Sequence, residues 1–148
     1  MSDLDKILWT AVATLAGGTF LFLLTQFVSE IVIKPFLRFR GVLEELSATL
    51  IYRSGILCSM SYEQAPDLHK EIHFEMRRFA GKLRAAVVQI PFYGVLSAFR
   101  CMPSRRNVKE AAGLLIRLSN FTGDKSRMDS NFEDIGKIGV LLKIDTGR

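Results

Sequence analysis

The sequence predicts an all-α protein, with one N-terminal transmembrane helix followed by a small cytosolic helical bundle. Two observations support this fold class. Residues 7–29 contain no charged side chain and are numerous enough to cross the roughly 30 Å hydrocarbon core of a bilayer as a helix. After this run, apolar residues recur every three or four positions, as on one face of an α-helix, and no segment alternates as a half-buried strand does.

The uncharged run differs from a secretory signal peptide and from a buried core helix. A signal peptide has a shorter apolar region that follows a positive segment, whereas here Asp3 and Asp5 lie beside the single basic residue Lys6. A small soluble domain rarely encloses a helix that is apolar on all sides. A membrane span is therefore the favoured interpretation.

The flanking charges predict the orientation of the span. Lys6 is the only basic residue before it, whereas Lys34, Arg38 and Arg40 follow it closely. Basic residues near a span stay on the cytoplasmic side. We therefore expect the N-terminus outside, the rest of the chain in the cytosol, and these three basic side chains at the membrane surface.

Pro35 is expected to end the span, because the residue before a proline is disfavoured in a helix. The predicted domains are residues 1–34, an N-terminal segment with the span, and residues 35–148, a basic cytosolic domain. The net charge is +5, which favours anionic lipid as a partner. Nucleic acid is disfavoured because the basic residues are scattered. Cys58 and Cys101 are expected to be reduced in the cytosol, and no CxxC spacing indicates a metal or redox pair.

Small residues within the span predict that two such helices associate. Ala13 and Gly17 lie four positions apart, as do Thr14 and Gly18, and this spacing permits close helix approach, although small residues are also common in spans generally. A second set of side chains, spaced by three and four positions, fits a coiled-coil seam between copies or, equally, one face of a small bundle. This set consists of Phe36, Phe39, Leu43, Leu46 and Leu50.

Three longer helices are expected after the segment that follows Pro35. Asp67 is expected to cap the first and Ser104 the second, and Ser130 with Glu133 predicts a capping box that opens the third. The side chains expected to face inward are Leu68, Ile72, Met76, Phe79, Leu83 and Val87 in the first helix, Val108, Ala112, Leu115 and Leu118 in the second, and Ile135, Ile138, Leu141 and Leu142 in the third.

The short aromatic stretch at residues 91–99 is the best candidate for a binding site. Phe92, Tyr93 and Phe99 offer rings and a hydroxyl that would suit a groove for a partner helix or a small ligand. The alternative is that this stretch closes the end of the bundle core or packs on the membrane surface.

His69 and His73 are a weak candidate for a metal site, because residues four apart share one face of a helix. Glu71 does not occupy the position of the general base in zinc-protease motifs, and the chain has no third histidine, which favours a structural pair. No nucleophile elbow or phosphate-binding loop is evident. We therefore expect a protein that is not an enzyme and needs no cofactor.

Three stretches, "FLRFRGVLEELSATLIY", "LRAAVVQIPFYGVLS" and "PSRRNVKEAAGLLIRLSN", resemble small bacterial membrane proteins of unknown function that have one N-terminal span and a helical tail. The resemblance covers roughly residues 20–121 and implies a location in the bacterial inner membrane. It implies no activity for any residue.

Two functional hypotheses follow. The first is a membrane-anchored helical module that binds a partner protein, a phosphorylated ligand or anionic lipid at the cytoplasmic face. The second is a homo-oligomeric membrane effector, of the toxin or anti-phage type, whose spans assemble and perturb the membrane. A polar stripe of Thr10, Thr14, Thr25 and Gln26 would be thin for a pore but adequate for helix packing.

Overall fold

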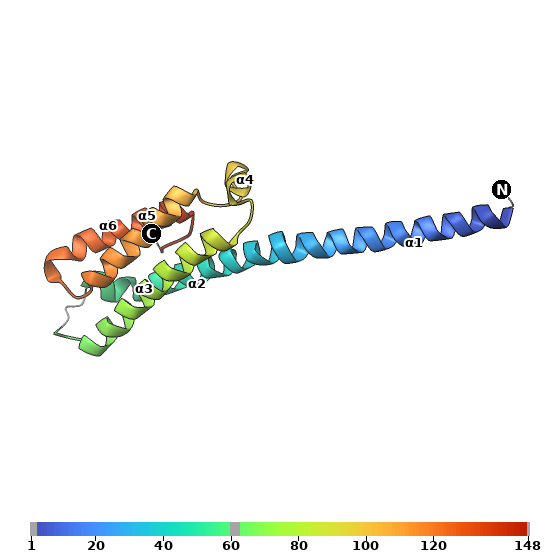
Figure 1. The fold of residues 1–148 in the computed structure, drawn as a ribbon. Helices are drawn as coiled ribbons and strands as arrows, with labels where there is room; N and C mark the ends of the chain where they lie inside the picture. Colours follow the sequence, from blue (N-terminus) through green and yellow to red (C-terminus); the bar gives the residue numbers. More distant parts are fainter. Residues whose placement is uncertain (1–2, 60–62, 148) are drawn as a thin grey trace.

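The protein is helical throughout the part of the chain that the computed structural model describes, residues 3–59 and 63–147, and no strand occurs there. This confirms the predicted all-α class. The helices, shown in Figure 1, are α1 (Asp3–Val28), α2 (Lys34–Ser59), α3 (Pro66–Gln89), α4 (Tyr93–Ala98), α5 (Arg105–Asn120) and α6 (Met128–Leu142). A π-helical turn (Ser29–Ile33) joins α1 to α2, and a 3-10 turn (Lys125–Arg127) precedes α6.

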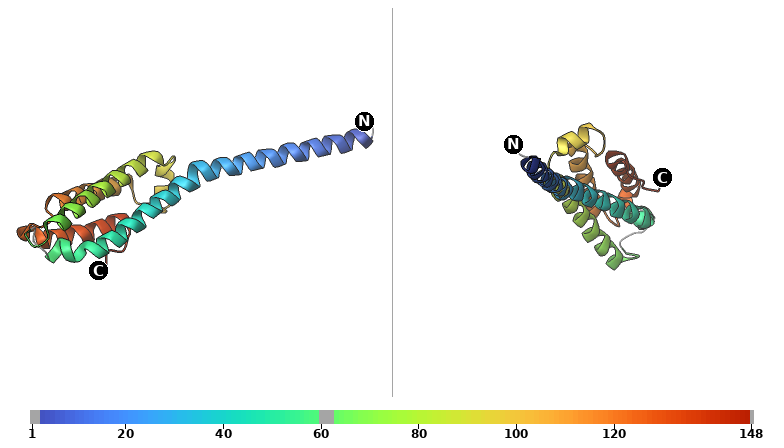
Figure 2. Two further views of the ribbon diagram at one scale, coloured as in Figure 1. Left: turned by 90° about the horizontal axis from the view of Figure 1, so that it is seen from below. Right: turned by 90° about the vertical axis from the view of Figure 1, so that its right-hand side faces the viewer.

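A single uninterrupted helix runs from Asp3 to Cys58 and dominates the shape of the molecule (Figure 1). Its first half, α1, has no buried residue and is long and apolar enough to cross a membrane. Its second half, α2, packs into the rest of the protein, which we call the head, residues 34–59 and 63–147. The two further views in Figure 2 show the same separation between a projecting helix and a packed head.

The prediction that the helix ends at Pro35 is wrong. Proline lacks a backbone N–H, and its ring clashes with the carbonyl group four residues earlier in a regular α-helix. Here the turn directly before it is π-helical, and the N–H of Lys34 donates to the carbonyl oxygen of Ser29, five residues back. This wider turn, together with the place of Pro35 in the first turn of α2, accommodates the proline without a break.

The core of the head lies between α2, α3, α5 and α6. Helix α3 packs along α5, α5 packs on α6, and α2 contacts both α3 and α6. The side chains predicted to face inward from α3, α5 and α6 are buried, except that Leu68 and Leu141 are partly buried. From α2 the core receives Phe39, Leu43, Leu46, Leu50 and Leu57. Periodicity alone therefore predicted the inward faces, because each helix buries one continuous apolar stripe.

One of the three predicted helix caps is confirmed. The side chain of Ser104 accepts a hydrogen bond from the backbone N–H of Asn107 at 3.1 Å. In contrast, α3 begins at Pro66, which suits the first turn of a helix, and Asp67 therefore lies inside it. The last helix begins at Met128, two residues before Ser130, so the expected capping box does not form. Asp124 instead caps the preceding 3-10 turn by accepting from the N–H of Ser126.

The C-terminal segment folds back onto α2. Lys143 ends α6 with a left-handed backbone (φ 57°), and the hydroxyl of Ser47 donates to the carbonyl oxygen of Asp145. Thr146 lies so close to Gly139 that a Cβ atom on Gly139 would be 3.0 Å from the methyl carbon of Thr146. The absence of a side chain at Gly139 therefore allows the segment to return across α6 toward α2.

Candidate interaction site beside the long helix

The stretch predicted as a groove lies at the end of the head from which α1 leaves, which we call the neck end. The neck end comprises the start of α2, the last turn of α3, α4 and the first turn of α5 (Figure 1). Tyr93 anchors α4 there. Its side chain is fully buried, its hydroxyl donates to the carbonyl oxygen of Pro103 at 2.7 Å, and its ring meets that of Phe39 edge to face at 6.3 Å between centroids. Tyr93 is therefore an anchor, and its prediction as a groove residue is wrong.

We predict that ionisation of Tyr93 destabilises the head in alkali. Burial raises the pKa of Tyr93 to about 12, although the charge of Arg105 lowers it. Between pH 10 and 12 the unfolded tyrosine loses its proton while the folded one keeps it, so the free energy of unfolding falls as pH rises. Two pKa units correspond to about 2–3 kcal/mol, of which about half is lost by pH 11.

Urea denaturation of the full chain in detergent at pH 8, 10 and 11, followed by circular dichroism, measures this loss. The control is Tyr93→Phe, which lacks the titrating group and should be about 1 kcal/mol less stable at pH 8, because it lacks the hydrogen bond to Pro103. Its stability should then fall less steeply with pH. Parallel losses in the two proteins would show that Tyr93 does not carry the effect.

The other aromatic side chains of this stretch point outward. Phe92 is 70% exposed and Phe99 is 75% exposed. Val95, which lies between them in sequence, and Val88 near the end of α3 are also exposed. Phe92 has a left-handed backbone (φ 55°), as does Arg100 at the other end of α4 (φ 57°). A bulky residue rarely adopts this conformation, and the strain costs about 1–3 kcal/mol. The packing of Tyr93 thus holds α4 in a conformation that leaves two phenylalanine rings in contact with solvent.

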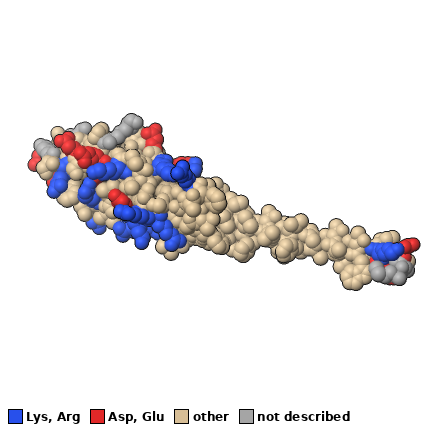
Figure 3. Space-filling view, turned by 90° about the horizontal axis from the view of Figure 1, so that it is seen from above, with Lys and Arg blue, Asp and Glu red and all other residues tan. Residues whose placement is uncertain are grey.

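Cationic side chains lie beside α4 and in a hollow between α3 and α5. The guanidinium carbon of Arg105 lies 5.5 Å from the centroid of the Tyr93 ring, which places this charge directly beside the helix. Arg84 and Lys109 line a hollow of about 320 Å³ between the end of α3 and the start of α5, and its remaining lining residues, Val87, Val88 and Val108, are apolar. Figure 3 shows Lys and Arg gathered on the head, including where it meets the long helix, whereas α1 is uncharged until its far end.

The basic residues predicted at the membrane surface lie at the start of α2. Lys34 pairs with Glu30 on the same helix, one turn earlier, so its charge is partly neutralised. Arg38 and Arg40 are exposed, and no carboxylate within the described residues forms a salt bridge with either. These two arginines therefore extend the basic surface of the neck end around α2.

A second cavity, of about 500 Å³, lies between α2, the segment after α4 and the C-terminal segment. Three cationic residues line it, Arg40, Arg100 and Lys143, but so do the acidic residues Glu44 and Asp145. Its charges are mixed, whereas the lining of the hollow between α3 and α5 includes no carboxylate.

The seam predicted between copies lies inside a single chain. Phe39, Leu43, Leu46 and Leu50 are buried in the core of the head, and Phe36 is partly buried against it. The stripe therefore forms one face of the core of the head, as in the alternative interpretation of a small bundle. It is not free to pair with a second copy. This corrects the prediction of an oligomer seam.

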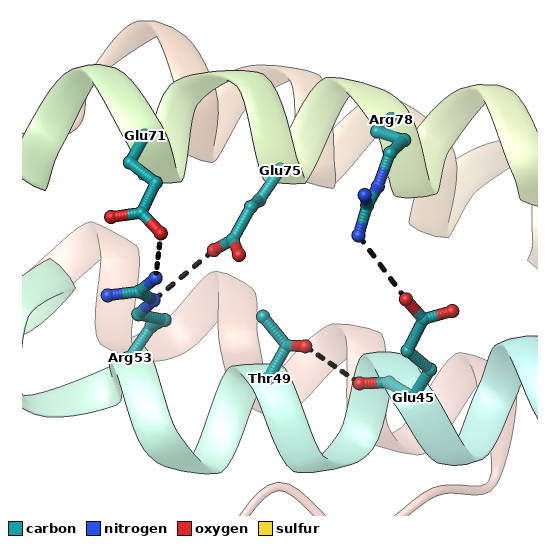
Figure 4. Close-up of polar contacts among 6 residues, drawn as sticks. All are labelled: Glu45, Thr49, Arg53, Glu71, Glu75 and Arg78. Atoms are coloured by element: carbon teal, nitrogen blue, oxygen red, sulfur yellow. Dashed lines mark hydrogen bonds and ion pairs between the residues drawn. The ribbon is translucent and has the colours of Figure 1, made fainter.

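Ion pairs close α2 onto α3 along one side of this stripe (Figure 4). Arg53 donates to Glu71 at 2.7 Å and to Glu75 at 3.2 Å, and Glu45 accepts from Arg78 at 3.3 Å. Burial alone would lower the pKa of Arg53, but the hydrogen bonds and charges of the two glutamates raise it above its usual value. Glu75 and Arg78, three residues apart on α3, both reach across to α2 and pair with Arg53 and Glu45 there.

One of the two histidines connects α3 to α5. Nδ1 of His73 lies 2.8 Å from the backbone oxygen of Ser119 on α5, and His69 is buried one turn earlier. Arg77 reinforces the same contact by donating to Asn120 at 2.9 Å. In residues 3–59 and 63–147, no group of three or more His, Cys, Asp and Glu side chains is arranged to hold a metal ion.

The association face predicted on α1 is exposed. Ala13, Gly17 and Gly18 are exposed and contact no part of the head, and this face remains the predicted surface for self-association. The hydroxyl of Thr14, like those of Thr10 and Thr25, donates at 2.8 Å to the carbonyl oxygen four residues earlier. These side chains are thus satisfied within their own helix and supply little polarity to a pore.

Neither a family model, nor a curated protein, nor a solved structure matches this chain.

Sequence inspection did not identify several residues of the neck end. Arg84, Arg105 and Lys109 come from two helices that are separated in sequence, and only the packing of α3 on α5 brings them to the same part of the head. The one available signal was the pair of arginines that begins α5. This pair indicated positive charge at the start of α5 but did not indicate which residues of α3 lie beside it.

Proposed function

We propose that this protein is a non-enzymatic, single-span membrane protein of the bacterial inner membrane that holds a basic helical bundle against the cytoplasmic lipid surface. The single observation that carries the proposal is the uninterrupted helix from Asp3 to Cys58. Its apolar half is fully exposed, while its other half supplies part of the core of the head. Any protein or lipid that binds the head is thereby coupled directly to the span.

The exposed apolar surface of α1 supports a membrane environment. From Leu4 to Val28 its large apolar side chains are exposed on all sides. Soluble proteins rarely present so extensive an apolar surface to water. Residues 7–29 would span about 34 Å as a helix, which matches the hydrocarbon core with a moderate tilt. Trp9 near one end and the Arg38 and Arg40 pair beyond the other suit the two interfaces.

The charge of the neck end supports an anionic lipid surface as the first binding partner. Each Lys or Arg close to a membrane with anionic lipids contributes about 1 kcal/mol of attraction. Arg38, Arg40 and Arg105 are exposed there, and Arg84 and Lys109 are exposed in the adjoining turns of α3 and α5. With the neck end against the membrane, the opposite end of the head, around α6 and the start of α3, would remain available to a protein partner in the cytosol (Figure 1).

Cysteine labelling tests the orientation. Cys101 is exposed at the neck end, whereas Cys58 is partly buried. In a Cys58→Ser background, a maleimide that does not cross membranes should modify Cys101 only after bacterial spheroplasts are permeabilised. A matched protein that carries Lys6→Cys with both native cysteines replaced by serine should be modified in intact spheroplasts. Labelling in the reverse order would place the head outside, and extraction of the intact protein by alkaline carbonate would refute the span.

A further inference from the structure

The position of α4 carries an inference about how the head lies on the membrane. Helix α4 lies beside the start of α2 through the contact of Tyr93 with Phe39, and both Figure 1 and Figure 2 show it at the end of the head from which α1 leaves. We propose that α4 inserts the rings of Phe92 and Phe99 into the headgroup layer of the bilayer that α1 spans, as a second attachment to anionic lipid. The proposal rests on the proposed function, because it requires α1 to be embedded.

The distance along the long helix limits how α4 can reach the bilayer. The uncharged run ends at Ser29, and Phe39 follows ten residues later. Ten residues of α-helix correspond to about 15 Å along the helix axis. The headgroup layer extends about 5–8 Å beyond the hydrocarbon core on each side of a bilayer. Because Tyr93 packs on Phe39, the outward rings of α4 reach that layer when the long helix tilts toward the face that carries α4.

The chemistry around α4 matches an anionic lipid surface. Amphipathic segments that lie in the membrane interface combine phenylalanine or other apolar side chains with lysine and arginine. The hollow between the end of α3 and the start of α5 is lined by three valines (Val87, Val88 and Val108), by two cationic residues and by no carboxylate. A lipid would match both the charge and the apolar lining, because its phosphate could pair with the cations while its apolar part contacts the valines. The cavity near the C-terminal segment, which includes two acidic residues, lacks this complementarity.

The backbone of α4 gives independent support. Phe92 and Arg100 both adopt the left-handed conformation at the two ends of a six-residue helix. This arrangement costs conformational energy and turns the Phe92 ring away from the core, where it is 70% exposed. Transfer of that ring from water to the interface would offset the cost. Within a head surrounded by water alone, the conformation brings no packing benefit to Phe92.

Tryptophan fluorescence in a bilayer tests the insertion. The chain has one tryptophan, Trp9, so a Trp9→Phe background permits a single probe at Phe99→Trp. The matched control is Phe74→Trp, because Phe74 is similarly exposed (71%) but lies in the first half of α3, away from α4. Each full-length protein would be reconstituted into nanodiscs of phosphatidylcholine and phosphatidylglycerol in which the phosphatidylcholine acyl chains are brominated near the headgroup.

We expect brominated lipid to quench the probe at position 99 at least threefold more than the probe at position 74, with a blue shift of its emission. Quenching at position 99 should fall at least twofold when phosphatidylglycerol is omitted, and equal quenching would overturn the role of anionic lipid. A blue shift without quenching would indicate contact with protein and would overturn insertion.

The native Trp9 separates this proposal from the one on which it rests. In the otherwise unchanged protein, Trp9 should be quenched by brominated lipid because it lies near the end of the span. Quenching at Trp9 together with equal, weak quenching at positions 99 and 74 would overturn the insertion of α4 alone. Absence of quenching at Trp9 would overturn the span and, with it, the contact of α4.

Discussion

Phe39→Ala should destabilise the head by about 3–5 kcal/mol and release α4 from α2. Phe39 is 1% exposed, belongs to the core and is the ring on which Tyr93 packs edge to face. Removal of a buried phenylalanine side chain loses its transfer free energy and leaves a cavity that the surrounding helices fill only partly. Because the same ring supports α4, the loss extends to the position of the two exposed phenylalanines.

Urea denaturation of the full chain in detergent, followed by circular dichroism, measures the free energy of unfolding. Phe74→Ala is the matched control, because it removes the same side chain from an exposed position of α3 and should change the stability by less than about 0.5 kcal/mol. A loss below about 1 kcal/mol for Phe39→Ala would show that α4 and α2 are not joined through this ring.

Arg53→Met should cost the head about 2–3 kcal/mol. The side chain of Arg53 is only 11% exposed, and its guanidinium group pairs with both Glu71 and Glu75. Methionine would preserve much of the volume but leave two carboxylates close together, one of them only 25% exposed. Loss of one partner from a buried ion pair costs up to about 3–5 kcal/mol, and the exposure of Glu71 reduces this figure.

Two further variants distinguish charge from volume at this position. The combination of Arg53→Met with Glu71→Gln and Glu75→Gln removes the uncompensated charges and should recover more than half of the lost stability. Arg78→Met breaks the exposed pair with Glu45, seen in the same close-up (Figure 4), and should cost less than about 1 kcal/mol. Equal losses for Arg53→Met and Arg78→Met would contradict a buried role for Arg53.

The coupling of the head to α1 gives these stabilities a functional meaning. Helix α2 is both the continuation of α1 and a part of the core, so a change in its tilt moves the whole head. In the proposed arrangement, α1 and α4 would attach the head to the bilayer at two points. The orientation of the head would then be fixed relative to the lipid surface, and the surface offered to a cytosolic partner would be defined.

Local sequence patterns were sufficient to predict the helices and their inward faces. A stripe with a period near 3.6, such as that from Ile72 to Val87 in α3, has one stable solution, which is to bury its apolar face. The uncharged run at residues 7–29 predicted the exposed apolar helix for a similar reason, because its length and composition are properties of the segment alone. The cap at Ser104 is equally local, since donor and acceptor lie three residues apart.

Tertiary structure decided everything that depends on which helix lies beside which. The stripe from Phe36 to Leu50 fitted both a seam between copies and a core face, and only its packing on α3 and α6 distinguished them. Tyr93, Phe92 and Phe99 are close in sequence, yet one is an anchor and two are exposed, because the left-handed backbone at Phe92 redirects the chain. Arg84 of α3 and Lys109 of α5 line one hollow, and no pattern within one segment encodes the contact of two helices distant in sequence.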